Sequence, residues 1–255
     1  GAVIFSNFQS SRYSTESNRF DMVIDSCVFE GFSSLYSGGV IHMINVNARI
    51  KIMNVIFQNN KAGSSDNKQG SGGALFIDTA TDVLLQHIRC QNNVAFRHGG
   101  CLSITSDDTD GLPAKVIVQH LESNNNEAKY RGGAVYVGRS STLKMADSTI
   151  QHSIGSGALF VNAGKMTVSN VMIRGAVPNT NDAAAIMCAS STLKMADSQI
   201  SNTKGRGLKS IGCLLVVEDT LFNDNVATSD GGAMLLTSES ELMVTSSTFL
   251  ANKAD

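Results

Sequence analysis

The stretch that decides the fold is Gly72-Gly73-Ala74-Leu75-Phe76-Ile77. It is a Gly-Gly step followed by alternating apolar residues, and this pattern recurs along the whole chain. Variants of the step begin at Gly38, Gly99, Gly132, Ser156 and Gly231. A second half of the motif is an apolar-x-apolar strand that closes on Phe-x-x-Asn, as in Phe57–Asn60. The second glycines, at 39, 73, 100, 133 and 157, are separated by 34, 27, 33 and 24 residues. Repeats of this length indicate a stacked solenoid.

Within each unit the apolar residues recur every second position, as Leu75 and Ile77 do around Phe76. This period indicates strands with one buried face. A further inward column reads Phe29, Phe57, Cys90, Ser123, Ile150, Ile173, Ile200, Phe222 and Phe249. We therefore predict an all-β fold, a right-handed parallel β-helix of about nine coils with three short strands per coil, where a coil is one turn of the solenoid.

Two columns are expected to form structural ladders along the axis. Glycine suits a sharp corner and leaves room where stacked backbones approach closely. Asparagine side chains just past a strand can bond to the turn and to each other from coil to coil. The ladder residues are Gly73, Gly100, Gly133, Gly232, Asn60, Asn93, Asn126, Asn225 and Asn252. Nine coils at about 4.8 Å each predict a rod of roughly 43 Å.

The motif resembles the repeat of the chlamydial polymorphic outer membrane proteins, with related repeats in large surface proteins of other bacteria and of protists. The match is good where Gly72–Leu75 accompanies Phe57–Asn60 and where Gly231–Met234 accompanies Phe222–Asn225. The units around residues 150 to 210 depart from it, with Ser153, Ala176 and Thr203 in place of the asparagine. The resemblance implies a pectin lyase-like β-helix displayed at the cell surface or outside the cell, often as an adhesin.

Composition limits the partners. The net charge of −2 is near balance and no basic block is present, so a nucleic-acid or anionic-membrane footprint is not expected. No apolar run approaches the length of a membrane span. No shift in composition divides residues 1–255, so we expect one β-helix domain, a fragment of a longer repeat array. The expected partners are other surface proteins, glycans or copies of the chain itself.

One nonapeptide is present twice, at Ser140–Ser148 and again 50 residues later at Ser190–Ser198. This spacing is two coils, and an internal duplication of this kind lengthens a rod. Duplication therefore favours a structural or display role over a site that is assembled once.

Five cysteines are present and none forms a C-x-x-C pair: Cys27, Cys90, Cys101, Cys188 and Cys213. Cys90, Cys101 and Cys188 fall in core or strand columns, so small buried thiols are the favoured interpretation. The odd count speaks against a disulfide framework. A Cys90–Cys101 bridge is open to the chain but is not predicted.

The candidate for chemistry is a column at the end of the second strand: Ser26, Asn54, His87, His120, Asp147, Asn170, Asp197, Asp219 and Ser246. Asp197 and Asp219 fall in adjacent coils, so their carboxylates are expected about 5 Å apart. That separation suits a retaining glycosidase pair or a calcium seat, with Lys194 or Arg206 as a base. The favoured alternative is structural, because a turn at a strand end prefers Asn, Asp or Ser.

Other constellations are weaker. His87 and His120 share the column and lack a third metal ligand at suitable spacing, which favours a turn stack. Ser106–Gly111 resembles the start of a calcium loop, but Ile117 stands where the bidentate acid is needed. Phe76, Tyr136 and Phe160 point outward as a patch for sugars or proteins, interrupted at Ser103. No metal or cofactor is expected.

Four insertions interrupt the register of the repeat. They are rich in Ser, Asn, Asp and Gly and poor in Trp and Tyr, which is typical of adaptable contacts without strong anchors. They span Ser6–Phe20, Lys61–Ser71, Thr105–Ala114 and Ala176–Asp182.

These features together favour a non-enzymatic extracellular or cell-surface rod that is structural, filamentous or adhesive. The alternative is a polysaccharide lyase or glycoside hydrolase of pectate lyase-like type, acting through Asp197 and Asp219. An enzyme needs a charged outward wall over several coils. The outward column lacks one, as it reads Lys51, Leu84, Ile117, Lys144, Thr167 and Lys194.

Overall fold

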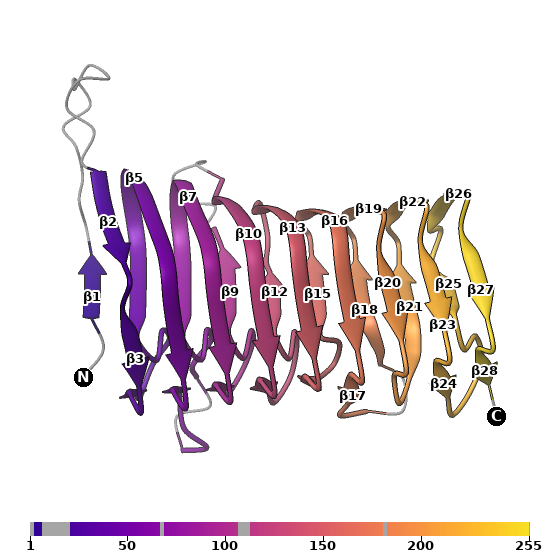
Figure 1. Ribbon diagram of the computed structural model, residues 1–255, viewed down its shortest axis with the longest axis horizontal. Coiled ribbons are helices and arrows are strands. Elements are labelled where there is room, and N and C mark those ends of the chain that lie inside the picture. Colours follow the sequence, from indigo (N-terminus) through magenta and orange to yellow (C-terminus); the bar gives the residue numbers. More distant parts are fainter. Residues whose placement is uncertain (1–2, 7–20, 67–68, 107–112, 181–182, 255) are drawn as a thin grey trace.

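The computed structural model describes residues 3–6, 21–66, 69–106, 113–180 and 183–254, and within them the chain forms strands and no helix. The coils lie side by side along one long axis, with the two termini at opposite ends of the rod (Figure 1). Neighbouring coils pair through parallel strands from end to end. The predicted all-β parallel β-helix is therefore confirmed.

Each coil has three strand-bearing sides. The first side follows the Gly-Gly step and holds β1 (Val3–Ser6), the start of β5 (Ile41–Gln58) and of β7 (Leu75–Gln91), β9 (Leu102–Thr105), β12 (Val135–Val137), β15 (Leu159–Asn162), β18 (Ala184–Ala189), β21 (Arg206–Ile211) and β25 (Met234–Thr237). We call this side the Gly-Gly side.

The second side contains the longest ladders and continues β5 and β7. Its other strands are β2 (Asp21–Asp25), β3 (Val28–Glu30), β10 (Lys115–Asn124), β13 (Thr142–Gln151), β16 (Lys165–Arg174), β19 (Thr192–Ala196), β20 (Gln199–Ser201), β22 (Leu214–Glu218), β23 (Leu221–Asn223), β26 (Glu241–Thr245) and β27 (Thr248–Leu250). In β10, β13 and β16 the backbone bends at one corner without interrupting the strand.

The third side consists of two-residue strands. They are β4 (Ser33–Ser34), β6 (Lys61–Ala62), β8 (Val94–Ala95), β11 (Glu127–Ala128), β14 (Ile154–Gly155), β17 (Val177–Pro178), β24 (Val226–Ala227) and β28 (Lys253–Ala254). Because these strands are short, the ladder residues Asn93, Asn126 and Asn225 are followed closely by the Gly-Gly steps at Gly99, Gly132 and Gly231.

The predicted inward column is paired residue by residue from Phe29 to Phe249. Rings stack where phenylalanines are neighbours, with centroids 5.4 Å apart for Phe29 and Phe57 and 5.1 Å apart for Phe222 and Phe249. Burial of such a column removes apolar surface from water in every coil and holds the register.

The Gly-Gly step has two distinct physical causes. Gly72 has a φ of 66°, a left-handed conformation that side chains with a Cβ rarely adopt. Gly73 has an ordinary φ, but a Cβ there would overlap the carbonyl oxygen of Gly100 in the next coil. The first glycine therefore turns the chain and the second admits the neighbouring coil.

The asparagine ladder is present in two runs. Asn60 Nδ2 donates to Asn93 Oδ1 at 2.9 Å, and Asn93 Nδ2 donates to Asn126 Oδ1 at 3.0 Å. In the second run Asn225 Nδ2 donates to Asn252 Oδ1 at 2.8 Å. Thr203 extends that run by donating its hydroxyl to Asn225 Oδ1, also at 2.8 Å. The predicted ladder is thus confirmed, and it is interrupted where Ser153 and Ala176 replace asparagine.

The expectation of small buried thiols at Cys90, Cys101 and Cys188 was wrong, because all three are in disulfides. Cys90 bonds to Cys101 across the interior of one coil, and Cys188 bonds to Cys213 in the next coil. Cys90 and Cys188 stand in columns that hold bulky residues elsewhere, such as Phe57 and Val161. The Cα atoms of the two pairs are 5.9 and 6.3 Å apart, within the span of a disulfide. Cys27 is free and partly buried.

Candidate functional site

The turn column that contains Asp197 and Asp219 is built by the backbone. Every member from Ser26 to Ser246 has a positive φ, including 48° at Asp197 and 44° at Asp219. Asn and Asp tolerate this left-handed conformation better than most residues. Asp197 and Asp219 lie in successive coils, as predicted, and both side chains are exposed. The backbone geometry accounts for their residue type without any catalytic role.

Amides and carboxylates of this corner bond from coil to coil. Asn170 Nδ2 donates to Asp147 Oδ1 at 2.7 Å, and Asn54 Nδ2 donates to Asp25 Oδ1 at 2.8 Å. The bond from Asn54, helped by the Ser26 hydroxyl, lowers the pKa of Asp25. These carboxylates therefore take part in holding the corners together.

Of the two candidate bases, Arg206 does not lie beside Asp197 and Asp219. Arg206 lies on the Gly-Gly side with its side chain buried, and its Nε donates to the carbonyl oxygen of Asp230 at 2.6 Å. Arg206 thus fixes the loop before the next coil and is removed from the turn column. Lys194 is exposed on β19, three residues before Asp197.

The imidazoles of His87 and His120 stack with centroids 4.6 Å apart and planes only 5° from parallel. They border a groove of about 460 Å³ that Asp147 and Glu122 also line. Among the described residues no three His, Cys, Asp or Glu side chains gather as metal ligands. The arrangement supports the turn stack. Of the acidic stretch Ser106–Gly111, only Ser106 is within the described residues.

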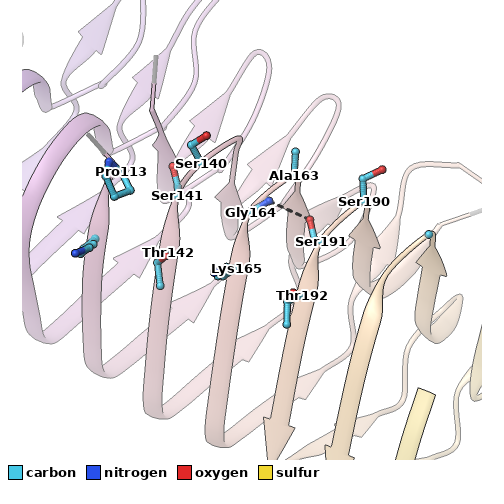
Figure 2. A pocket seen from close by; sticks show the side chains of 12 residues that line it. Pro113, Ser140, Ser141, Thr142, Ala163, Gly164, Lys165, Ser190, Ser191 and Thr192 are labelled. Atoms are coloured by element: carbon cyan, nitrogen blue, oxygen red, sulfur yellow. Dashed lines mark hydrogen bonds between the residues drawn. The ribbon is translucent and has the colours of Figure 1, made fainter. Parts of the chain in front are cut away.

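A larger groove, with a volume of about 640 Å³, lies beside the start of β10, β13, β16 and β19 (Figure 2). Its wall is lined by Ser140, Ser141 and Thr142 from one copy of the nonapeptide, and by Ser190, Ser191 and Thr192 from the other. Lys165 lies between the two copies, and Lys115 lies on the coil that precedes the first copy. The sequence duplication therefore repeats one hydroxyl-rich edge on alternate coils.

The Ser141 and Ser191 hydroxyls of this edge bond to the backbone, whereas the threonine side chains point outward. Ser191 Oγ accepts a hydrogen bond from Gly164 N at 3.1 Å and donates to Ala189 O at 2.6 Å. Ser141 Oγ donates to Arg139 O at 3.0 Å in the same way. These serines hold the corner. Thr142 and Thr192 lie one residue further on and point outward from the strand.

Next to the groove, two outward columns run across four coils. One pairs Lys115, Thr142, Lys165 and Thr192, and the other pairs Ile117, Lys144, Thr167 and Lys194. We call these eight residues the lysine–threonine face. The second column was recognised from the sequence as an outward column, but the first was not. The signal was available in the nonapeptide, where Thr142 and Lys144 are two residues apart and so lie on one face of a strand.

Comparison with family models decides the class of protein. Residues 118–254, more than half of the chain, match the right handed beta helix region. The chain belongs to the right-handed β-helix family. Residues 54–78 also match the Chlamydia polymorphic membrane protein repeat, and this stretch contains Phe57, Asn60, Gly72 and Gly73. No curated protein and no solved structure matches the chain significantly.

The match confirms two expectations for this right-handed β-helix. The hand of the solenoid is the predicted one. The resemblance noted from Phe57–Asn60 with Gly72–Leu75 lies within the matched repeat. No described helix is long and apolar enough to cross a bilayer.

The predicted exposed aromatic patch of the β-helix was wrong. Tyr136 and Phe160 point outward from the Gly-Gly side but are only 8% and 5% exposed. His98 stacks on Tyr136 with centroids 4.5 Å apart, and the Arg131 guanidinium lies 5.1 Å from the Phe160 ring centre. Residues just before the glycines therefore cover the outward rings, a tertiary contact that alternation alone does not reveal.

Burial has an electrostatic consequence at His98. Desolvation, followed by the positive charges of Arg97 and Arg131, lowers the pKa of His98 to about 4. Its Nδ1 is buried without a hydrogen-bond partner in the described chain. His98 is therefore a neutral packing residue at physiological pH.

Proposed function

We propose that this β-helix is a non-enzymatic rod, displayed outside the cell or on its surface, that acts as a structural or adhesive element. The observation that supports this most is the unbroken inward column, which pairs coil to coil from Phe29 to Phe249. A continuous ladder makes a stiff spacer, because each coil is fixed by its two neighbours. Such a spacer presents its side faces to partners.

Two observations favour a location outside the cytoplasm. The Cys90–Cys101 and Cys188–Cys213 bridges are of the kind that persists in oxidising environments. The matched repeat is that of a polymorphic membrane protein. Other surface proteins, glycans and copies of the same chain are the partner classes that fit a displayed rod.

The enzymatic alternative has its own test, because the β-helix fold is also used by enzymes. Asp197 and Asp219 are exposed corner residues, in a column that elsewhere holds Asn54 and Asn170. We expect no cleavage in a screen of neutral and acidic polysaccharides. Cleavage that disappears in the Asp197→Asn, Asp219→Asn variant would establish the enzyme instead.

Electron microscopy of the native, full-length material tests the display function. We expect rods or fibres at the cell periphery, and an antibody against this segment should bind intact cells. Protease treatment of intact cells should remove that signal. Labelling only after permeabilisation, or discrete short particles without surface signal, would contradict the proposal.

A further inference from the structure

The lysine–threonine face has an unusual charge pattern. Lys115, Lys144, Lys165 and Lys194 supply one exposed ammonium group per coil over four successive coils. Within the described residues none of the four has a carboxylate at salt-bridge distance. Acidic groups bound the face without entering it: Asp82 precedes Lys115 in the same column, and Asp147 lies three residues beyond Lys144.

The four lysines alternate between the two columns. Lys115 and Lys165 occupy one column with threonine between them, while Lys144 and Lys194 occupy the other, again with threonine between them. Like charges directly opposite on neighbouring strands destabilise a sheet, and the diagonal offset moves them to about 8 Å. The zigzag thus keeps four unpaired cations on adjacent coils at low internal cost, which leaves them available to an external anion.

We infer that the lysine–threonine face, with the groove beside it, binds a linear acidic polysaccharide laid along the rod axis. This rests on the proposed display function and names the ligand class of its adhesive side. Successive lysines in one column are two coils, about 10 Å, apart. A spacing of that order suits carboxylates or sulfates that recur once per disaccharide. Thr142, Thr167 and Thr192 place hydroxyls between the cations for the sugar hydroxyls.

Two other polyanions fit less well. In a duplex the phosphates of one strand advance by about 3.4 Å each along the helix axis while they wind around it, so they do not form a straight row of anions along this face. The face also lacks the aromatic rings on which single-stranded bases stack, since its eight members are lysine, threonine and isoleucine. An anionic bilayer is flat and would leave the 640 Å³ groove unfilled. The elongated, hydroxyl-lined groove favours a flexible sugar chain.

Titration calorimetry of the chain with hyaluronate, which has one carboxylate per disaccharide, and with the more densely charged heparin tests the inference. We expect saturable binding to at least one of the two at low salt, its loss near molar salt, and no binding of uncharged dextran. The Lys144→Gln, Lys194→Gln variant should weaken binding at least about tenfold. The matched control removes two exposed lysines elsewhere, Lys61→Gln with Lys204→Gln, and should stay within about twofold.

Two outcomes would overturn the inference. If both double variants weaken polysaccharide binding equally, the protein attracts the polysaccharide through its overall charge and not through a site on this face. Tighter face-dependent binding of single-stranded DNA or of phosphatidylserine vesicles would assign the face to another class of partner. All substituted side chains are exposed, so retention of the β-sheet circular dichroism and of the melting temperature is expected in each variant. Failure here leaves the display function standing, because surface labelling tests that separately.

Discussion

Asn93 concentrates several buried hydrogen bonds in one side chain. Its Nδ2 donates to Phe57 O at 2.9 Å and to Asn126 at 3.0 Å, while its Oδ1 accepts from Asn60 N at 3.0 Å. The residue is fully buried, so water cannot replace these partners. A buried polar group without a partner costs more than the bond itself contributes.

The Asn93→Ala variant should therefore lose hydrogen bonds to both neighbouring coils. We expect the free energy of unfolding to fall by about 3–5 kcal/mol, since each orphaned group costs about 1–3 kcal/mol. Equilibrium denaturation in guanidinium measures the change. The control is Asn92→Gly, an exposed neighbour with a φ of 54°, where glycine fits the backbone and the loss should stay below about 1 kcal/mol. Equal losses in the two variants would contradict the ladder's role.

His98 makes the stability of the rod depend on pH. Its folded-state pKa, about 4, lies below the usual 6.5, so the unfolded chain binds the proton more readily. Neutral His98 therefore contributes fully to the free energy of unfolding above pH 6.5. This contribution is lost as the pH falls towards 4, by up to about 3 kcal/mol. His98→Gln should flatten the decline of the melting temperature between these values. An exposed control, His152→Asn, should leave the decline unchanged, and an unchanged slope in His98→Gln would disprove the assignment.

At the scale of elements, the disulfides fasten the Gly-Gly side to its neighbours. Cys90 lies in β7 and Cys101 just before β9, while Cys188 lies in β18 and Cys213 just before β22. Denatured protein should therefore release one thiol without reductant, that of Cys27, and five with reductant. Reduction should lower stability by about 3 kcal/mol per bridge. Cys27→Ser should leave no thiol before reduction. Five thiols before reduction would refute both bridges.

The elements also show what sequence can and cannot predict. Strand alternation and the Phe29–Phe249 column were predictable, because one buried face forces a period of two. The roles of Asn60 and Gly73 were predictable because these residue types recur at fixed positions of the repeat. The disulfides, the covering of Tyr136 by His98 and the displacement of Arg206 were not. Each depends on which side chain lies across the interior or over a corner, and the repeat does not encode that.

At the scale of the molecule, the lysine–threonine face and its groove depend on registration over four coils. Residues 50 positions apart in sequence, Lys144 and Lys194, lie in one column only because the intervening coils keep their register. The duplicated nonapeptide was evident in the sequence, but the column that contains Lys115, Thr142, Lys165 and Thr192 was not. That column requires knowing that the coil between the two copies presents Lys165 at the position of Thr142.

The backbone ladders join each coil to the coil before it and the coil after it, and this has a mechanical consequence. A pull on one end along the axis loads a single ladder at a time, so the rod would peel coil by coil and would not rupture as a whole. The last repeat of 27 residues would release about 90 Å of chain when it detaches. A tether of this kind gives way in steps under load, dissipating tension between two attached surfaces while the remaining coils stay wound.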